Sequence, residues 1–280
     1  MAKMLRPKAR FYRTIPMDRA GLQEEAVALE AARTALVAMH CWNIGCPDGP
    51  PVDNHFYVGM GFPAAHREAY KIMRDRILPA VEAAREAGIL VAHVESSRVG
   101  AKHRDLMEVP PTVTHCQIEG EVPPQAVPGY RRQIADRAHG AAYETRSPCA
   151  SMDRAAFLMP KAGEPFAMDS LQLHRMLHNR GIENLVYTGF ATDMCVLHSP
   201  GGIIEMACSY SYRVFLIREA TFGVEYPDWF DRRTSTEFGI RRVESHYGHS
   251  IGWDDWMEQC RLLRAPGHRA VGQSDMDQER

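Results

Sequence analysis

The stretch NLVYTGFATDMCV, residues 184–196, carries the signal that decides the fold. Its first seven residues are mostly apolar, which is typical of a buried strand in a parallel sheet. A turn that contains Gly189 ends this strand, and Cys195 stands where the next helix is predicted to begin. A helix N-terminus favours negative charge and lowers the pKa of a thiol there. The pattern fits a reactive cysteine or a small buried core cysteine, and spacing alone does not separate the two.

Strands and helices alternate on both sides of this stretch. Besides 184–190, the sequence predicts strands at residues 34–40, 89–96, 155–160 and 212–220 and near Ser250. It predicts helices at residues 22–33, 63–87 with a break at Pro79, 131–139, 170–179, 195–208 and 232–247. Pro79 is expected in the first turn of a second helix, which Gly88 ends as a C-terminal cap. Such alternation is typical of an α/β fold with three layers, αβα, around a mostly parallel sheet of about six strands.

Four residues with reactive side chains each follow a predicted strand: His40, Glu95, Lys161 and Cys195. In a parallel sheet the carboxyl ends of the strands gather at one edge, where ligands and reactive groups lie. We therefore expect these four residues at one edge of the sheet.

The remaining sequence suggests a single domain with additions. We assign residues 31–260 to this domain, with an N-terminal arm and helix at 1–30 and a polar tail at 261–280. Residues 97–150 are rich in proline and irregular, so we interpret them as an insertion that acts as a lid or in assembly.

Composition narrows the possible partners. The 280 residues include 33 basic and 35 acidic side chains, a net charge of −2, so there is no electrostatic reason to bind nucleic acid or an anionic membrane. There is no apolar run long enough to span a membrane and no secretory signal, so we expect a cytoplasmic protein. The seven cysteines include no C-x-x-C pair and are interpreted as free thiols.

Five segments together resemble one family, the isochorismatase-like cysteine hydrolases. This family includes nicotinamidases, N-carbamoylsarcosine amidohydrolase, and the ureidoacrylate and biuret amidohydrolases. The segments follow the family order and are TALVAMHCWN (34–43), ILPAVEAAREAGILVAHV (77–94), FLMPK (157–161), RGIENLVYTGFATDMCV (180–196) and SYRVFLIREAT (211–221). The resemblance covers about residues 32–255 except 97–150, and it implies an isochorismatase-like, Rossmann-like fold.

The resemblance also implies a catalytic triad of cysteine, lysine and aspartate. Cys195 matches the nucleophile that attacks an amide carbonyl, and Lys161 matches the lysine that favours the thiolate. The family's aspartate, which takes the thiol proton and passes it to the leaving amine, aligns with His40. The backbone N–H groups of Ala191, Thr192 and Cys195 would form the oxyanion hole, and a cis peptide is expected between Phe190 and Ala191.

The histidine at position 40 leaves three interpretations open. His40 could itself act as the base, since neutral imidazole can deprotonate a thiol. A carboxylate could instead fill the role, with Glu95 the best candidate and Asp48 and Asp53 as others. In the third interpretation the site has lost amide hydrolysis.

Further residues are candidates for the substrate pocket or for assembly. The pocket candidates are Trp42, His93, Glu95, Phe166, Phe190 and His198. Asp53 and His55 have the spacing of two zinc ligands in nicotinamidases, but we favour a surface loop and expect neither a metal nor another cofactor. The resemblance implies a homodimer or homotetramer, with residues 1–30 and 97–150 as candidate contacts.

The leading hypothesis is a cysteine-dependent hydrolase that cleaves a C–N bond of a small amide, ureide or carbamoyl compound. The reaction would pass through an acyl-thioester on Cys195. The alternative is an altered or inactive relative that binds a small ligand or acts as a scaffold, because His40 replaces the aspartate. Vinyl ether hydrolysis of the isochorismatase type is disfavoured, since those relatives lack the nucleophilic cysteine.

Overall fold

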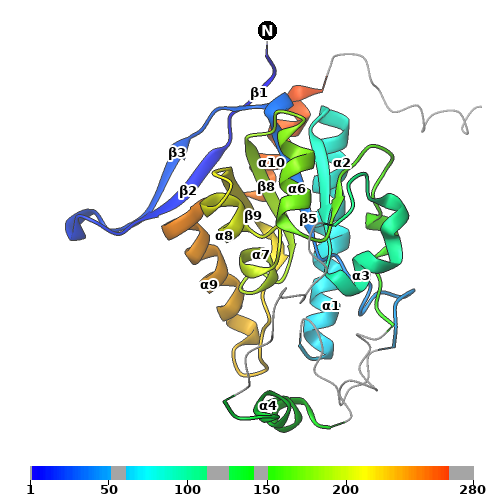
Figure 1. Cartoon of the computed structure of the whole chain (residues 1–280). Helices are drawn as coiled ribbons and strands as arrows, with labels where there is room; N and C mark the ends of the chain where they lie inside the picture. The colour runs from blue at the N-terminus through cyan, green and yellow to red at the C-terminus, as the bar shows by residue number, and fades with distance from the viewer. Residues whose placement is uncertain (1, 52–60, 112–125, 142–150, 265–280) are drawn as a thin grey trace, which may run out of the picture.

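A mixed sheet of eight strands forms the centre of the computed structural model, which describes residues 2–51, 61–111, 126–141 and 151–264 (Figure 1). The strand order is β3-β2-β10-β9-β8-β5-β6-β7. All pairs from β10 to β7 are parallel, while β2 and β3 form an antiparallel hairpin at one side. The strand bounds are β2 Lys8–Arg13, β3 Gly21–Ala26, β5 Thr34–Met39, β6 Leu90–Val94, β7 Phe166–Ala167, β8 Asn184–Phe190, β9 Arg213–Phe222 and β10 Gly248–Ile251. The predicted mostly parallel sheet is confirmed.

The central strands are buried along their whole length, because helices cover both faces of the sheet. Every residue of β5 and β8 is buried, so neither strand shows the alternation of a half-exposed strand. One face lies under α1, α2 and α10, and the other lies under α6, α7, α8 and α9. The helix bounds are α1 Pro63–Ile72, α2 Leu78–Ala87, α6 Ser170–His178, α7 Cys195–His198, α8 Ile203–Cys208, α9 Thr234–Arg242 and α10 Trp253–Leu263.

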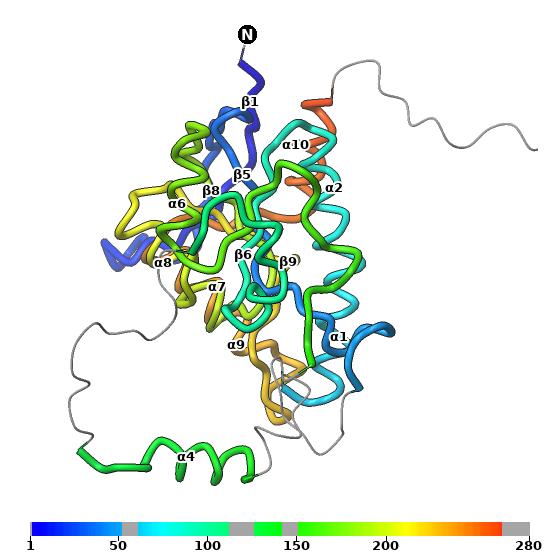
Figure 2. The backbone as a smooth tube through the Cα atoms, turned by 45° about the vertical axis from the view of Figure 1, so that its right-hand side comes forward, coloured from blue at the N-terminus to red at the C-terminus, as the bar shows by residue number. Residues whose placement is uncertain are grey.

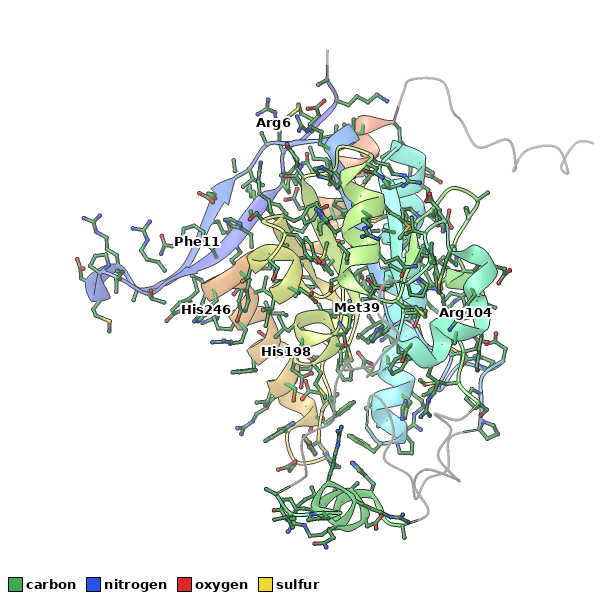
Figure 3. All side chains as sticks on the ribbon, in the orientation of Figure 1. Arg6, Phe11, Met39, Arg104, His198 and His246 are labelled. Carbon is green, nitrogen blue, oxygen red and sulfur yellow. The ribbon has the colours of Figure 1, made fainter. Side chains whose placement is uncertain are left out.

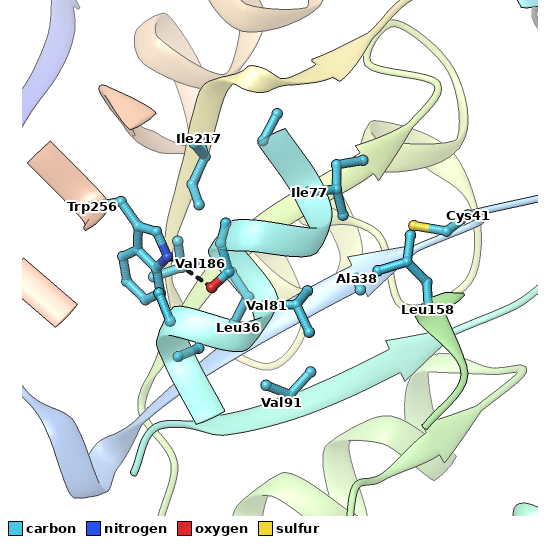
Figure 4. Close-up of a cluster of buried hydrophobic side chains, with 14 of the residues drawn as sticks. Leu36, Ala38, Cys41, Ile77, Val81, Val91, Leu158, Val186, Ile217 and Trp256 are labelled. Atoms are coloured by element: carbon cyan, nitrogen blue, oxygen red, sulfur yellow. Dashed lines mark hydrogen bonds between the residues drawn. The ribbon is translucent and has the colours of Figure 1, made fainter. Parts of the chain in front are cut away.

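Side chains from alternate positions of each strand fill two separate apolar layers. Leu36 and Val186 point into the layer beneath α2 and α10, whereas Val37 and Tyr187 point into the opposite one. In the first layer the indole N–H of Trp256 donates to the carbonyl of Ala80 at 3.2 Å and fixes α10 on α2 (Figure 4). Our sequence analysis did not predict α10. Its residue Trp256 is buried and completes this layer.

Pro79 does not break the helix that precedes β6. Residues 73–77 form a single π-helical turn between α1 and α2, and Pro79 lies in the first turn of α2. Proline lacks an N–H and is tolerated in a first turn, so the changed hydrogen-bond register absorbs it without a loop. Gly88 ends α2 in the left-handed conformation, with φ 76°, as predicted.

The N-terminal region corrects our prediction of an irregular arm followed by a helix at residues 22–33. Instead it contains the short strands β1 Met4–Leu5 and β4 Leu29–Glu30, the β2–β3 hairpin, and a 3₁₀ turn at 31–33. Residues 22–26 are rich in helix formers, but β2 supplies a complete set of backbone partners to β3. Tertiary pairing has overridden local propensity here. The hairpin runs away from the body of the sheet in Figure 1.

Two further segments differ from the prediction because proline and glycine interrupt them. Residues 155–160 do not form a strand but contain a 3₁₀ turn, Ala156–Leu158, and end in Pro160, which lacks a ladder donor. The predicted helix at 195–208 is divided into α7 and α8 by the sequence PGG at residues 200–202. The predicted helix at 232–247 is present as α9 followed by a π-helical turn at 243–247.

The predicted insertion at residues 97–150 is described only in part. It begins with α3 Ser97–Gly100 and a 3₁₀ segment at 101–106, and it contains α4 Tyr130–His139. No residue of α4 is buried, and the helix stands apart from the layers in Figure 2. Residues 112–125 and 142–150 lie outside the described part.

Candidate active site

Three of the predicted site residues lie at one edge of the sheet. His40 follows β5, Glu95 follows β6, and the turn before Cys195 follows β8. Because the order of these strands is β8-β5-β6, the three strand ends are neighbours. The N–H of His40 donates to the carbonyl of Val94 at 3.0 Å and joins two of these ends directly.

Cys195 is the first residue of α7. It is partly buried against the apolar layer between the sheet and α6, α7, α8 and α9. Among the described cysteines, burial raises the pKa of Cys41, Cys46 and Cys260 to about 12, which keeps those thiols protonated at neutral pH. Cys195 and Cys208 are the two described cysteines with solvent access. Of these two, only Cys195 lies at the carboxyl edge of the sheet.

The turn before Cys195 is shaped by close backbone contacts. Gly189 has φ 114°, and a Cβ there would lie 2.0 Å from the carbonyl oxygen of Met39, so only glycine lets β8 approach β5 this closely. The peptide bond between Phe190 and Ala191 is cis. The cis peptide bond that the resemblance implied at this position is therefore present.

The N–H groups of this turn are only partly engaged. Thr192 donates its N–H to the carbonyl of Phe222 at 3.1 Å, and Val196 donates to the carbonyl of Ala191 at 3.0 Å. Within the described chain, the N–H groups of Ala191 and Cys195 have no backbone acceptor. The predicted oxyanion donor Thr192 is therefore already engaged, which leaves Ala191 and Cys195 as the remaining candidates.

A small pocket opens beside His40, between the sheet edge and the helix that runs from α1 into α2. Its volume is about 10 Å³, which is room for one water molecule. Its walls come from the ends of β5 and β8, from α1 and from the π-helical turn, and they are formed by His40, Trp42, Ile44, His66, Ala69, Met73 and Phe190. Two of the predicted pocket residues, Trp42 and Phe190, are among these.

His40 is 4% exposed and has φ 47°, an uncommon conformation for a residue other than glycine. Its ring stacks on Trp42 with centroids 5.1 Å apart and an interplanar angle of 16°. Its Nδ1 is buried and has no hydrogen-bond partner among the described residues. Burial, and then the positive charge of Arg154, lower the pKa of His40 to about 3. The imidazole is therefore neutral at physiological pH.

Glu95 and His93 lie behind the pocket wall and are held by Arg154. Glu95 is completely buried, and its Oε2 accepts a hydrogen bond from Trp42 Nε1 at 2.8 Å, while Arg154 Nη1 donates to Oε1. Burial raises the pKa of Glu95, opposed by Arg154, Trp42 and the N–H of Ser96. Both carboxylate oxygens are thus engaged, and Glu95 does not line the pocket beside His40.

The ring of His93 links Arg154 to a second carboxylate. Its Nδ1 lies 2.7 Å from Arg154 Nη2, and its Nε2 lies 2.7 Å from Glu164 Oε2. A guanidinium only donates, so Nδ1 accepts and Nε2 carries the proton that is donated to Glu164. Burial, followed by Arg154, lowers the pKa of His93 to about 4, in agreement with this neutral tautomer.

Lys161 lies at the surface, where 60% of its side chain is exposed. Its Nζ is paired with Glu82 of α2 at 3.0 Å. Neither Lys161 nor Cys195 is part of the pocket wall beside His40. Its backbone N–H donates to Glu164 at 2.8 Å. Burial raises the pKa of Glu164, but hydrogen bonds from Arg85, His93 and the N–H of Lys161 outweigh burial and lower this pKa to about 2.

The last two predicted pocket residues lie elsewhere. Phe166 is buried in β7 opposite His93, with its ring edge against His103. His198 is exposed on α7, three residues after Cys195 (Figure 3). Neither residue lines the pocket beside His40.

Sequence reasoning missed Arg154, Met73 and a pocket role for His66. Arg154 precedes the apolar run AAFLMP, and an arginine beside such a run can be buried only if carboxylates pair with it. The sequence could therefore have indicated that Arg154 is buried, but not which carboxylates pair with it.

Asp53 and His55 lie outside the described residues. In the part that the structure describes, no three His, Cys, Asp or Glu side chains form a group suited to a metal. No helix in the described ranges is long and apolar enough to cross a membrane.

Comparison with solved structures shows the class of fold. The chain is similar to a cysteine hydrolase from Pseudomonas syringae pv. phaseolicola 1448A, with a TM-score of 0.50 and 14% identity over 84% of this chain and 95% of that one. It is also similar to an isochorismatase family protein from Desulfovibrio vulgaris (TM-score 0.45, 16% identity, 79% and 95% covered). A third is the nicotinamidase SaPncA from Staphylococcus aureus (TM-score 0.42, 12% identity, 79% and 99% covered).

The predicted fold class, a three-layer α/β fold around a mostly parallel sheet, is thereby confirmed. No family model matches the chain, and no curated protein matches it. Because identities of this size show the fold alone, the activity has to be argued from the site itself.

Proposed function

We propose that this protein is a cysteine-dependent hydrolase that cleaves the C–N bond of a small amide, ureide or carbamoyl compound. The observation that carries the proposal is the position of Cys195. It is a solvent-accessible thiol at the carboxyl end of β8, on a turn whose Ala191 and Cys195 N–H groups have no backbone acceptor. Nucleophile and oxyanion donors therefore come from one short segment.

The reaction has two steps at Cys195. The thiolate Sγ attacks the carbonyl carbon, the C–N bond breaks, and the nitrogen leaves with a proton as amine or ammonia. Water then attacks the acyl-thioester, which releases the acid and restores the thiol. The N–H groups of Ala191 and Cys195 hold the oxyanion in both steps. Since α7 has only four residues, these directed N–H groups contribute more than a helix dipole does.

His40 is our candidate for the proton transfer. Its pKa of about 3 means that an imidazolium is not a resting state of the site. A neutral ring can still pass the thiol proton to the departing nitrogen within one step, because the proton need not stay on the ring. Both oxygens of Glu95 are engaged by Trp42 and Arg154, so the structure supports His40 over Glu95 for this role.

The test is release of amine or ammonia from a panel of primary amides, ureides and carbamoyl compounds. Wild type, Cys195→Ala, His40→Ala and Glu95→Gln are compared, with Cys208→Ala as the matched control because Cys208 is also accessible. We expect activity in wild type and Cys208→Ala and a loss in Cys195→Ala and His40→Ala. Glu95→Gln leaves the buried Arg154 without its carboxylate, so we expect it to lower activity without abolishing it. Retention of activity in Cys195→Ala would overturn the proposal.

One observation favours a second function, the binding of a small ligand without turnover. The residue that aligns with the family's aspartate is His40, which burial and the charge of Arg154 hold neutral, so the site has no carboxylate at the position of the family's base. In that case no compound of the panel would be hydrolysed, and iodoacetamide would modify Cys195 no faster than Cys208.

We also propose that the chain forms a homodimer or homotetramer. The hairpin β2–β3 leaves β3 as an exposed edge strand, and its turn region exposes Ile15, Met17 and Leu22. Unpaired strand edges and exposed apolar side chains are features that a second copy can cover. Light scattering on the eluting protein gives the mass directly, and a monomer at micromolar concentration would contradict the proposal.

A further inference from the structure

We infer that Arg154 is the positioning residue of the candidate site, and that its buried guanidinium holds the wall formed by Trp42 and His40. The inference rests on the proposed function only in taking the pocket beside His40 as the site. Arg154 was assigned no role by the family resemblance, which placed the positive charge at Lys161.

The side chain of Arg154 is completely buried and makes three hydrogen bonds at once. Its Nε donates to the carbonyl of Leu158 at 2.7 Å, its Nη2 donates to His93 Nδ1 at 2.7 Å, and its Nη1 donates to Glu95 Oε1. Its backbone forms an antiparallel bridge with Trp42. Only the planar fork of arginine donates in all these directions from one group, so a lysine cannot replace it.

The contacts continue from Arg154 to the pocket. Glu95 is fixed by Arg154 through one oxygen and holds the indole N–H of Trp42 with the other, at 2.8 Å. The indole in turn stacks on His40. Since Nδ1 of His40 has no hydrogen-bond partner among the described residues, the stack and the backbone set the orientation of this ring. Arg154 therefore acts on His40 through Glu95 and Trp42, without touching the pocket.

The charge of Arg154 has a second effect on His40. The titratable groups around this ring are Arg154 and Glu95 behind it, His66 in the same pocket wall and the buried thiol of Cys41, with Cys195 following the neighbouring strand β8. Among them the guanidinium is the charge that lowers the pKa of His40, in addition to burial. The same group that orients the imidazole also keeps it neutral.

Lys161 stands at the outer end of the same chain of contacts. Its backbone N–H binds Glu164, which binds His93, which binds Arg154. Its ammonium group faces solvent and Glu82 instead. The positive charge near His40 is thus supplied by a residue seven positions earlier in the chain.

The experiment measures the protonation of His40 by NMR, with the signal assigned from a His40→Gln spectrum. Arg154→Met combined with Glu95→Gln removes both charges, so that no buried charge is left alone. Arg154→Lys keeps the charge and loses the fork, and Lys161→Met is the matched control. The rate at which iodoacetamide modifies Cys195 is followed in the same variants.

In wild type we expect His40 to stay neutral down to about pH 4.5. The double variant keeps the burial of the ring but lacks the charge of Arg154, so we expect His40 to titrate at a higher pH than in wild type. Arg154→Lys should leave the titration low but shift the ring signals of Trp42 and His40. Lys161→Met should match wild type in every measurement. A wild-type titration in the double variant, or a shift of His40 in Lys161→Met, would overturn the inference.

These readouts do not depend on turnover. If the titration of His40 moves as expected while the panel shows no hydrolysis, Arg154 positions a binding site and the hydrolase proposal fails alone. If hydrolysis occurs and the titration of His40 does not move, the hydrolase proposal stands and the positioning role of Arg154 fails.

Discussion

The two halves of the candidate site are built in opposite ways. On the side of β5 and β6, Arg154, Glu95 and His93 are buried and joined by hydrogen bonds that use almost every polar atom. On the side of β8, Cys195 is accessible and two N–H groups of its turn have no backbone acceptor. We expect the first half to stabilise the fold because its groups are paired, and the second to be reactive because its thiol is accessible.

The comparison separates positioning from chemistry. A change in the paired half leaves a buried charge without its partner and should weaken folding as well as the site. A change in the open half removes a group with no structural partner and should weaken activity with little effect on folding. The four predictions below test this separation.

The largest effect is expected from Cys195→Ala. Removing a nucleophile usually lowers the hydrolysis rate by at least about 10³-fold, because the thioester route is lost. The free energy of unfolding should change by less than about 1 kcal/mol, since the side chain is only partly buried. Rates on a substrate found with the amide panel, together with urea unfolding, give both numbers. A large loss of stability would place Cys195 in the packed half of the molecule.

The next effect is expected from Arg154→Ala, measured by urea unfolding at neutral pH. Breaking one partner of a buried ion pair costs about 3–5 kcal/mol, because Glu95 is left charged and buried. The double variant Arg154→Met with Glu95→Gln should lose clearly less, since it removes both charges. Equal losses in the two variants would mean that packing, not the unpaired charge, dominates this region.

The sequence predicted the parallel core well because burial dictates its residues directly. An unbroken apolar run such as TALVAM (34–39) has no stable place except between two helical layers, and β5 is buried throughout. Gly88 was equally predictable, since a glycine after a helical stretch is the usual left-handed cap. Local chemistry was sufficient at such positions.

The rest depended on contacts between distant segments. Residues 22–26 look helical, and only the partner strand β2 makes them a strand. The ends of β5 and β6 were predicted to lie together, but nothing local in the sequence shows that Arg154 reaches Glu95, 59 positions away. The resemblance assigned the positive charge of the site to Lys161 because of its position along the chain. In the structure the buried positive charge near His40 is that of Arg154.

On the side of β5 and β6, His93 and His40 lead us to predict a loss of stability in mild acid. The pKa of His93 is lowered to about 4 and that of His40 to about 3, against 6.5 for an unfolded histidine. The unfolded chain therefore binds these protons first, so the stability is present above pH 6.5 and is lost as the pH falls toward 4 and below. The loss should reach up to about 3 kcal/mol for each histidine. Urea midpoints between pH 7.5 and pH 4.5 measure it, and His93→Gln should flatten the slope.

The smallest effect is expected from Lys161→Met. Its ion pair with Glu82 is largely exposed, and exposed pairs contribute about 0–1 kcal/mol to stability because water and salt screen them. Hydrolysis should stay within about threefold of wild type, since its ammonium group faces Glu82 and solvent. The measurement bears directly on the division of the site. A loss as large as that in Cys195→Ala would mean that Lys161 leaves Glu82 and turns toward the thiol during the reaction. The positive charge would then belong to the open half, and Arg154 would be left with a purely structural role.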